Sequence, residues 1–212
     1  GPRWPPAARK AATLVKSLRE AKRHSTWGSP NASYENAMLS LVDRALDSDR
    51  TPEFLNAFLP FEERIARLGV QNSLIQTALK LTAPGVPDIY QGSDLWNLSM
   101  VDPDNRRPVD YEKRVQALDE FISQRSRIEA LRQYLRSWQD GRIKLAITTE
   151  VLRCRQAYPA LFASGSYEPC AVQGTKAQQI VAFIRRHAQH TLLVAVARFP
   201  AHSRRREIHH LP

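Results

Sequence analysis

Cysteine is scarce in this chain of 212 residues, and long apolar runs are missing from it. The two cysteines, Cys154 and Cys170, cannot build a disulfide framework, and neither belongs to a CxxC pair. No window approaches the roughly eighteen consecutive apolar residues of a membrane-spanning helix. The first six residues, GPRWPP, lack the apolar core of a secretory signal. The sequence therefore predicts a cytoplasmic protein with reduced thiols and no membrane partner.

Positive charge is in excess, because 31 lysines and arginines face 21 acidic residues, a net charge of +10. Such a balance raises the expectation of a nucleic acid or another anionic partner. The charge, however, is dispersed in short basic clusters that acidic stretches separate, and no nucleic-acid-binding motif accompanies it. We therefore predict no nucleic-acid partner.

Helical periodicity dominates the first part of the chain. An amphipathic pattern over 7–23 predicts a helix, and Asn31 or Ser33 can cap the next one. The sequence SDRTPE then puts Pro52 at the first position of a third helix, a strong start signal. Pro60 is predicted to kink or restart that helix, whose apolar spacing continues to residue 82.

The next pattern is a short apolar segment between prolines and glycines. The sequence PGVPDIYQG at 84–92 predicts a very short buried strand with a tight turn at each end. Asp110 is then predicted to cap a helix that continues through Leu135. Residues 140–142 break this pattern, and a further helix is predicted to end before Pro159.

The last part of the chain changes to β-branched apolar runs, which favour strands. These runs lie at 170–172, 180–184 and 192–197, and they predict an antiparallel sheet of at least three strands. Residues 200–212 are predicted to lack structure. The expected fold class is mainly α with a small antiparallel β tail.

The densest polar stretch is DPDNRRP at 102–108. Prolines restrict its backbone, while Asp, Asn and Arg present acceptors and fork-shaped donors, which suits a ligand rich in hydroxyl groups. The alternative is a rigid turn held by its own Asp–Arg pairs, and the residues alone leave the two evenly balanced. Its position directly after a short buried strand favours a binding site.

Several segments together resemble one enzyme family. They are LTAPGVPDIYQG at 81–92, LW at 95–96, LSMVDPDNRRPVD at 98–110, DGRIKL at 140–145 and the stretch 161–169. This combination closely resembles the maltooligosyltrehalose synthases of the alpha-amylase family. The chain departs from the family pattern at Asp94, where Glu is usual, and at Asn97, where Asp is usual.

The resemblance implies a (β/α)8 barrel enzyme that converts the reducing-end α-1,4 bond of a maltooligosaccharide into an α,α-1,1 bond. It implies a retaining mechanism with an Asp nucleophile, a Glu acid/base and a second Asp, and no metal or organic cofactor. The segment ending at Gly92 resembles the last barrel strand, so the three carboxylates are expected before residue 1. The chain is thus expected to be a C-terminal fragment that is inactive alone and whose partner is the missing N-terminal barrel portion.

The resemblance also implies a division of the chain and a set of substrate-binding residues. Residues 1–83 would be a helical insertion and the helix before the last strand. Residues 84–160 would hold the last strand, substrate loop and closing helices, 161–199 a partial β domain and 200–212 a disordered tail. The candidate substrate-binding residues are Tyr90, Trp96, Asp102, Asp104, Asn105, Arg106, Arg107, Arg142 and Lys144.

Each candidate has a structural alternative. Trp96 is more often a core residue than a sugar platform, by roughly two to one. Arg142 favours, by a small margin, an ion pair with Asp140 at a helix start. His202, His209 and His210 are close in sequence but lie in the predicted tail, so we predict no metal site.

Two further expectations concern the chain by itself. The alternative function is a catalytically inert helical module that binds glucan or a partner chain. A strand without its neighbours is also expected to expose apolar residues around Leu74, Leu79, Val86 and Ile89, so that the chain associates or binds apolar dyes.

Overall fold

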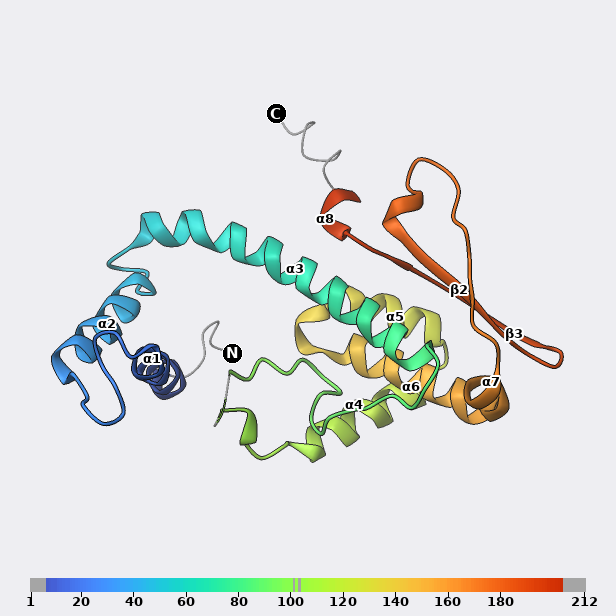
Figure 1. Ribbon diagram of the computed structural model, residues 1–212, viewed down its shortest axis with the longest axis horizontal. Helices are drawn as coiled ribbons and strands as arrows, with labels where there is room; N and C mark the ends of the chain where they lie inside the picture. Colours follow the sequence, from blue (N-terminus) through green and yellow to red (C-terminus); the bar gives the residue numbers. More distant parts are fainter. Residues whose placement is uncertain (1–6, 101, 103, 204–212) are drawn as a thin grey trace. The chain divides into compact units, whose positions relative to one another are not determined.

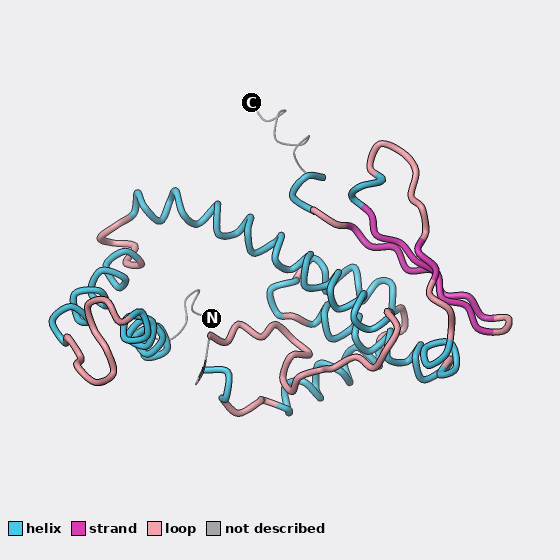
Figure 2. The backbone as a smooth tube through the Cα atoms, viewed as in Figure 1, coloured by secondary structure: helices cyan, strands magenta, loops and turns pink. Residues whose placement is uncertain are grey.

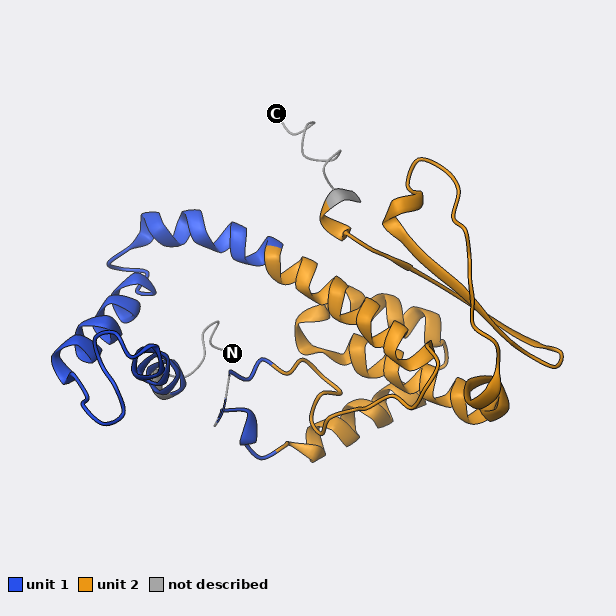
Figure 3. Ribbon diagram, viewed as in Figure 1, with its two compact units in different colours: residues 1–64, 98–108 blue, residues 65–97, 109–212 orange. Residues whose placement is uncertain are grey.

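The computed structural model describes residues 7–100, 102 and 104–203, and the chain forms two compact units. Unit 1 is Gly1–Arg64 with Leu98–Pro108, and unit 2 is Ile65–Asn97 with Val109–Pro212, blue and orange in Figure 3. Contacts within the chain define these units, whereas the predicted division into 1–83, 84–160, 161–199 and 200–212 refers to parts of a longer enzyme. That division therefore stays a prediction.

Unit 1 contains α1 (Ala7–Ala21), α2 (Ala32–Ala45) and the first part of α3 (Pro52–Thr82), which Figure 1 labels. Asn31 caps α2, because its side chain accepts a hydrogen bond from the backbone N–H of Tyr34 at 3.1 Å. The predicted start of α3 at Pro52 is confirmed. Of the two effects predicted for Pro60, the restart is wrong, since the helix continues through it. A long helix can tolerate the loss of one backbone hydrogen bond.

A buried ion pair joins α1 to α2. Arg19 donates from Nε and Nη2 to the two carboxylate oxygens of Glu35 at 2.8 and 2.9 Å. Ser25, in the intervening loop, donates to Glu35 Oε1 at 2.5 Å, and both Ser25 and Glu35 are buried. These hydrogen bonds, that from Arg19 first, lower the pKa of Glu35 to about 2. The loop between α1 and α2 is therefore fixed by charge-assisted hydrogen bonds as well as by packing.

The core of unit 2 lies among four helical elements: the second part of α3, α4 (Tyr111–Ser123), α5 (Arg127–Arg136) and α6 (Arg142–Ala157). Its buried cluster consists of Phe121, Ala130, Tyr134, Ile143 and Ala146, with Leu74 and Trp96 among the half-buried residues packed against it. The helix predicted from Asp110 to Leu135 is in fact two helices. Asp110 caps α4 as predicted, but Ser126 caps a new helix by accepting from the N–H of Glu129 at 3.3 Å. Ser126 is a capping residue within a continuous apolar pattern, and the pattern alone predicted one helix instead of two.

A three-stranded antiparallel sheet confirms the predicted β tail (Figure 2). It consists of β1 (Glu168–Pro169), β2 (Ile180–His187) and β3 (His190–Ala197), in the order β1-β2-β3. The first strand lies just before the predicted run at 170–172, and the short helix α7 (Pro159–Ser164) packs against β2. In the predicted tail at 200–212, the helix α8 (Pro200–Ser203) contradicts the absence of structure, and the rest lies outside the described residues.

The predicted buried strand at 84–92 is wrong. The segment forms no strand, and Val86 is 95% exposed. A parallel strand needs neighbours that supply backbone hydrogen bonds, and the described part of the chain offers it none. Separately, no helix within the described ranges is long and apolar enough to cross a membrane.

Two arginines hold the start of this segment at the end of α3. Arg155 of α6 donates to the carbonyls of Leu81 at 2.9 Å and Gly85 at 3.1 Å. Arg185 of β2 is 1% exposed, and it donates to the carbonyls of Thr82 at 3.5 Å and Phe162 at 3.0 Å. Burial lowers the pKa of Arg185, with a further contribution from Arg155. Arg185 therefore donates to carbonyl oxygens in the last turns of two helices instead of to a carboxylate.

Candidate functional site

The candidate site residues are divided between the two units, so they are described as two sets. Unit 1 holds the loop residues Asp102, Asp104, Asn105, Arg106 and Arg107, of which the short 3-10 helix η1 (Asp104–Arg106) contains three. Unit 2 holds Tyr90, Trp96, Arg142 and Lys144.

Asp104 is the anchor of the loop in unit 1. Arg9 of α1 donates to it from Nε at 2.8 Å and from Nη2 at 2.7 Å. The backbone N–H of Met100 donates at 2.7 Å, and Arg107 Nε lies 2.9 Å from Oδ1. The Arg9 hydrogen bonds and then the Met100 hydrogen bond lower the pKa of Asp104 to about 2. This carboxylate is held ionised and fully engaged, which suits positioning rather than proton transfer.

The other loop residues combine internal pairing with exposure. Asp102 Oδ1 pairs with Arg106 Nε at 2.5 Å, and Arg107 Nε donates to the Asp104 carbonyl at 2.9 Å. The Arg106 side chain is nevertheless 75% exposed, and Asn105 is also exposed. The structure therefore contains the Asp–Arg pairs of a rigid turn, and that turn presents Arg106 and Asn105 to solvent.

The sequence did not reveal what holds this loop in place. Besides Arg9, Lys16 of α1 donates to the backbone carbonyl of Asp102. Arg9 and Lys16 are seven residues apart, so a helix places them on one face. The sequence therefore indicates that Arg9 and Lys16 share a helix face. It does not indicate that this face contacts the loop, because Arg9 and Asp104 are 95 positions apart in the chain.

Tyr90 and Trp96 differ in their surroundings within unit 2. Trp96 packs against the buried cluster, and its Nε1 donates to the carbonyl of Trp138 at 2.6 Å, which is the packing alternative for this residue. Gly141 lies against it: a Cβ there would stand 2.8 Å from the Trp96 backbone nitrogen. Tyr90, in contrast, is 55% exposed and is not among the residues packed against the buried cluster.

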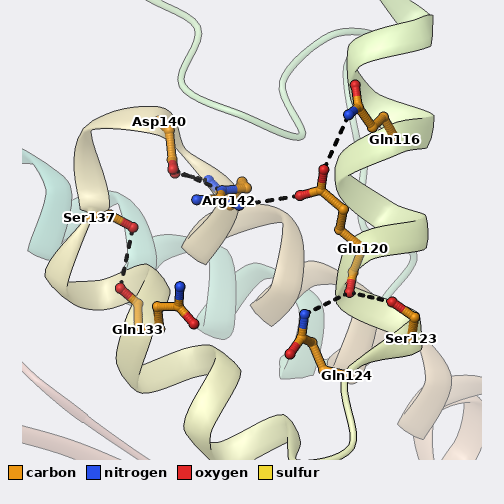
Figure 4. A network of polar contacts seen from close by, with 8 residues as sticks. All are labelled: Gln116, Glu120, Ser123, Gln124, Gln133, Ser137, Asp140 and Arg142. Carbon is orange, nitrogen blue, oxygen red and sulfur yellow. Dashed lines mark hydrogen bonds and ion pairs between the residues drawn. The ribbon is translucent and has the colours of Figure 1, made fainter.

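Arg142 lies between Asp140 and Glu120 in the polar network of Figure 4. Its Nε donates to Asp140 Oδ2 at 2.8 Å, and its Nη1 donates to Glu120 Oε2 of α4 at 3.3 Å. The guanidinium also lies over the ring of Tyr134, 4.6 Å from the centroid. The predicted ion pair with Asp140 is confirmed, and Arg142 connects the start of α6 to α4 and α5.

Lys144 lies two residues after Arg142 in the first turn of α6, and it is half-buried. Burial, and then the nearby charge of Lys80, lowers its pKa, while Asp94 acts in the opposite direction. Among the described residues, no group of three or more His, Cys, Asp or Glu side chains is arranged to hold a metal ion.

Comparison with known proteins gives consistent matches, although no family model matches the chain. A maltooligosyl trehalose synthase of Mycobacterium tuberculosis is 33% identical over 204 residues, which are 92% of this chain and 23% of that protein. A crystal structure of maltooligosyl trehalose synthase is 32% identical with a TM-score of 0.75, and covers 90% of this chain and 24% of its own. The Arthrobacter ramosus enzyme is 29% identical with a TM-score of 0.74, over 94% of this chain and 24% of that one.

These matches agree with the helical fold and its small antiparallel sheet, and the matched proteins are named as maltooligosyl trehalose or glycosyltrehalose synthases. Over the segment that it matches, the chain belongs to the maltooligosyl trehalose synthase family. The chain spans about a quarter of the length of these relatives, 23% of the Mycobacterium tuberculosis protein.

Proposed function

We propose that this chain is the C-terminal segment of an intramolecular glucosyltransferase of the maltooligosyl trehalose synthase family. The complete enzyme would convert the reducing-end α-1,4 bond of a maltooligosaccharide into the α,α-1,1 bond of trehalose. The observation that carries the proposal is 33% identity over 92% of the chain to a protein that bears this name. The TM-score of 0.75 to a solved synthase supports the same assignment.

The proposed role of the chain in that enzyme is to bind substrate. In unit 1, the loop at 102–107 would hold glucose units through hydroxyl hydrogen bonds, with Arg106 and Asn105 as its exposed donors. In unit 2, Tyr90 would supply a stacking ring. Asp104, Arg107, Arg142 and Trp96 make the contacts within the chain described above, and their proposed role is to position these groups.

The chemical step is assigned to other parts of the enzyme. A retaining mechanism needs a nucleophilic carboxylate and an acid/base carboxyl group at a fixed separation on rigid elements. The strongly shifted carboxylates of unit 1, Asp104 and Glu35, are bound to arginines and held ionised, which excludes them as proton donors near neutral pH. We therefore expect this chain alone to form no trehalose product.

Replacing Arg106 tests the binding role directly. In the complete enzyme, Arg106→Ala is expected to reduce kcat/KM for maltohexaose by ten-fold or more, equal to a loss of about 1.4 kcal/mol of transition-state stabilisation. Steady-state kinetics with product analysis would measure it. Arg132→Ala is the matched control, since Arg132 and Arg106 are both mostly exposed arginines, each paired with a carboxylate close by in the sequence. Unchanged kinetics in Arg106→Ala would refute the assigned role.

A further inference from the structure

A small pocket in unit 2 brings two lysines together. Lys80 of α3 and Lys144 of α6 line it, together with the hydroxyl residues Thr77, Ser93 and Thr148 and the carboxylate of Asp94. Thr77 and Lys80 are three residues apart on α3, and Lys144 and Thr148 are four apart on α6. Each pair therefore lies on one face of its helix, and these two faces form two walls of the pocket.

Three physical effects oppose a positive charge on Lys144. The side chain is half-buried, so its ammonium loses hydration. The charge of Lys80 repels it. Lys144 also lies in the first turn of α6, which has no acidic residue there, and the positive end of the helix dipole disfavours a cation. A cation that three local effects disfavour, with one shared carboxylate to compensate, points to a functional site.

The chain offers little compensation within the pocket. Asp94 is the carboxylate near Lys144, and it also lies 3.3 Å from Arg114 Nε, so one negative charge faces three positive ones. Within the described ranges, Lys144 donates no hydrogen bond, whereas Arg142, two residues earlier, is bound to both Asp140 and Glu120. In the first turn of α6, Arg142 is therefore paired with two carboxylates, whereas Lys144 lacks a full counter-charge.

The available donors indicate which ligand would fit. Thr77 and Ser93 already donate their hydroxyl hydrogens to the carbonyls of Ser73 at 2.8 Å and Tyr90 at 2.6 Å. Exposed Lys80, half-buried Lys144 and Thr148 remain as donors that line the pocket from the two helices. We propose that this pocket binds a small oxyanion of the phosphate type, with Lys80 and Lys144 as charged donors and Thr148 as a hydroxyl donor.

This site goes beyond the proposed sugar-binding function, because an anion rather than a neutral glucose unit would occupy it. A divalent oxyanion offsets the excess of two positive charges and accepts several hydrogen bonds at once. The same chemistry is offered by inorganic phosphate and by the phosphate group of a sugar phosphate, and these two sources can be distinguished by experiment.

Titration of the whole chain with inorganic phosphate at constant ionic strength tests the site. Phosphate is expected to raise the Tm in a saturable way, and calorimetry would give the affinity. Lys144→Met and Lys80→Met should each weaken binding by about ten-fold or more, as expected for the loss of one charge-assisted hydrogen bond. Lys113→Met, at an exposed lysine of α4, is the control and should bind as the unmodified chain does.

Lys144→Arg keeps the charge and should retain binding within a few-fold, so that a loss in Lys144→Met can be assigned to charge if both variants are folded by circular dichroism. A hexose phosphate that binds more tightly than inorganic phosphate would identify a sugar phosphate as the ligand, and equal affinity would identify phosphate itself. The proposal is overturned if phosphate produces no saturable rise in Tm, or if the rise is the same in Lys144→Met.

Discussion

Single carboxylates in this chain act as anchors when an arginine approaches them in two-pronged geometry. Asp104 illustrates this, since Arg9 holds both of its oxygens and lowers its pKa from 3.8 to about 2. A carboxylate whose pKa is lower in the folded state contributes stability above its unfolded pKa and loses it as the pH falls through the folded pKa. The contribution of Asp104 is therefore present at neutral pH and disappears between pH 3.8 and about 2.

This gives a prediction for Asp104→Asn. The variant should have a lower Tm than the unmodified chain at pH 7, and its Tm should fall less steeply between pH 4 and pH 2 because one group no longer titrates. Thermal unfolding followed by circular dichroism at several pH values would measure both effects. Asp43→Asn serves as the control, since Asp43 also pairs with α1, through Lys10 at 3.3 Å, but its side chain is 65% exposed. Equal pH slopes for Asp104→Asn and the unmodified chain would contradict the anchor role.

At the scale of elements, two glycines in unit 2 have opposite meanings. Gly141 joins η2 (Trp138–Asp140) to α6 with a φ of +81°, and a Cβ there would lie 2.8 Å from the Trp96 backbone nitrogen. Gly69 is inside α3, where an added Cβ would meet nothing within 4 Å. The first glycine is required by backbone conformation and close packing, whereas the second only weakens its helix.

The same substitution should therefore have opposite effects at these two positions. Gly69→Ala is expected to raise the free energy of unfolding by about 0.5–1 kcal/mol, the difference in helix propensity. Gly141→Ala is expected to lower it by about 1–3 kcal/mol, because alanine is strained at positive φ and its methyl group collides with backbone. Urea denaturation of both variants measures the changes. A neutral Gly141→Ala would show that the turn before α6 can relax.

At the scale of the whole molecule, apolar surface is exposed on the described residues. Of the four residues expected to be exposed, Val86 is 95% exposed, while Leu74, Leu79 and Ile89 are half-buried. Leu98 and Leu193 are 82% and 63% exposed. Because exposed apolar residues of this kind are sites of association, the chain is expected to bind other apolar molecules.

The corresponding prediction uses a dye that fluoresces on apolar surfaces. The folded chain is expected to increase the fluorescence of such a dye and to sediment as species larger than a monomer of 24.1 kDa. Val86→Ser should reduce the dye signal, because it removes the most exposed of these side chains. A compact monomer that leaves the dye dark would contradict this expectation.

Local signals were sufficient for much of the fold. The caps at Asn31 and Asp110, the start of α3 at Pro52 and the β-branched runs of β2 and β3 depend on neighbouring residues, so their physics is contained in short stretches of sequence. The helix boundary at Ser126 was not predicted, because one apolar pattern continues across both helices. The predicted strand at 84–92 was wrong, because a parallel strand forms only beside other strands.

The sequence by itself determined most of the helices, the β tail and which polar loop resembles the family pattern, since propensity, capping and motif are local properties. Only the tertiary structure decided what each polar residue contacts. In the folded chain, Asp104 pairs with Arg9 of α1 and Arg142 pairs with Glu120. Arg185 donates to carbonyls in the last turns of α3 and α7. The tertiary structure also placed Lys144 beside Lys80. These partners are 22 to 103 positions apart, and only folding brings charges so distant in the chain within hydrogen-bonding or Coulombic range.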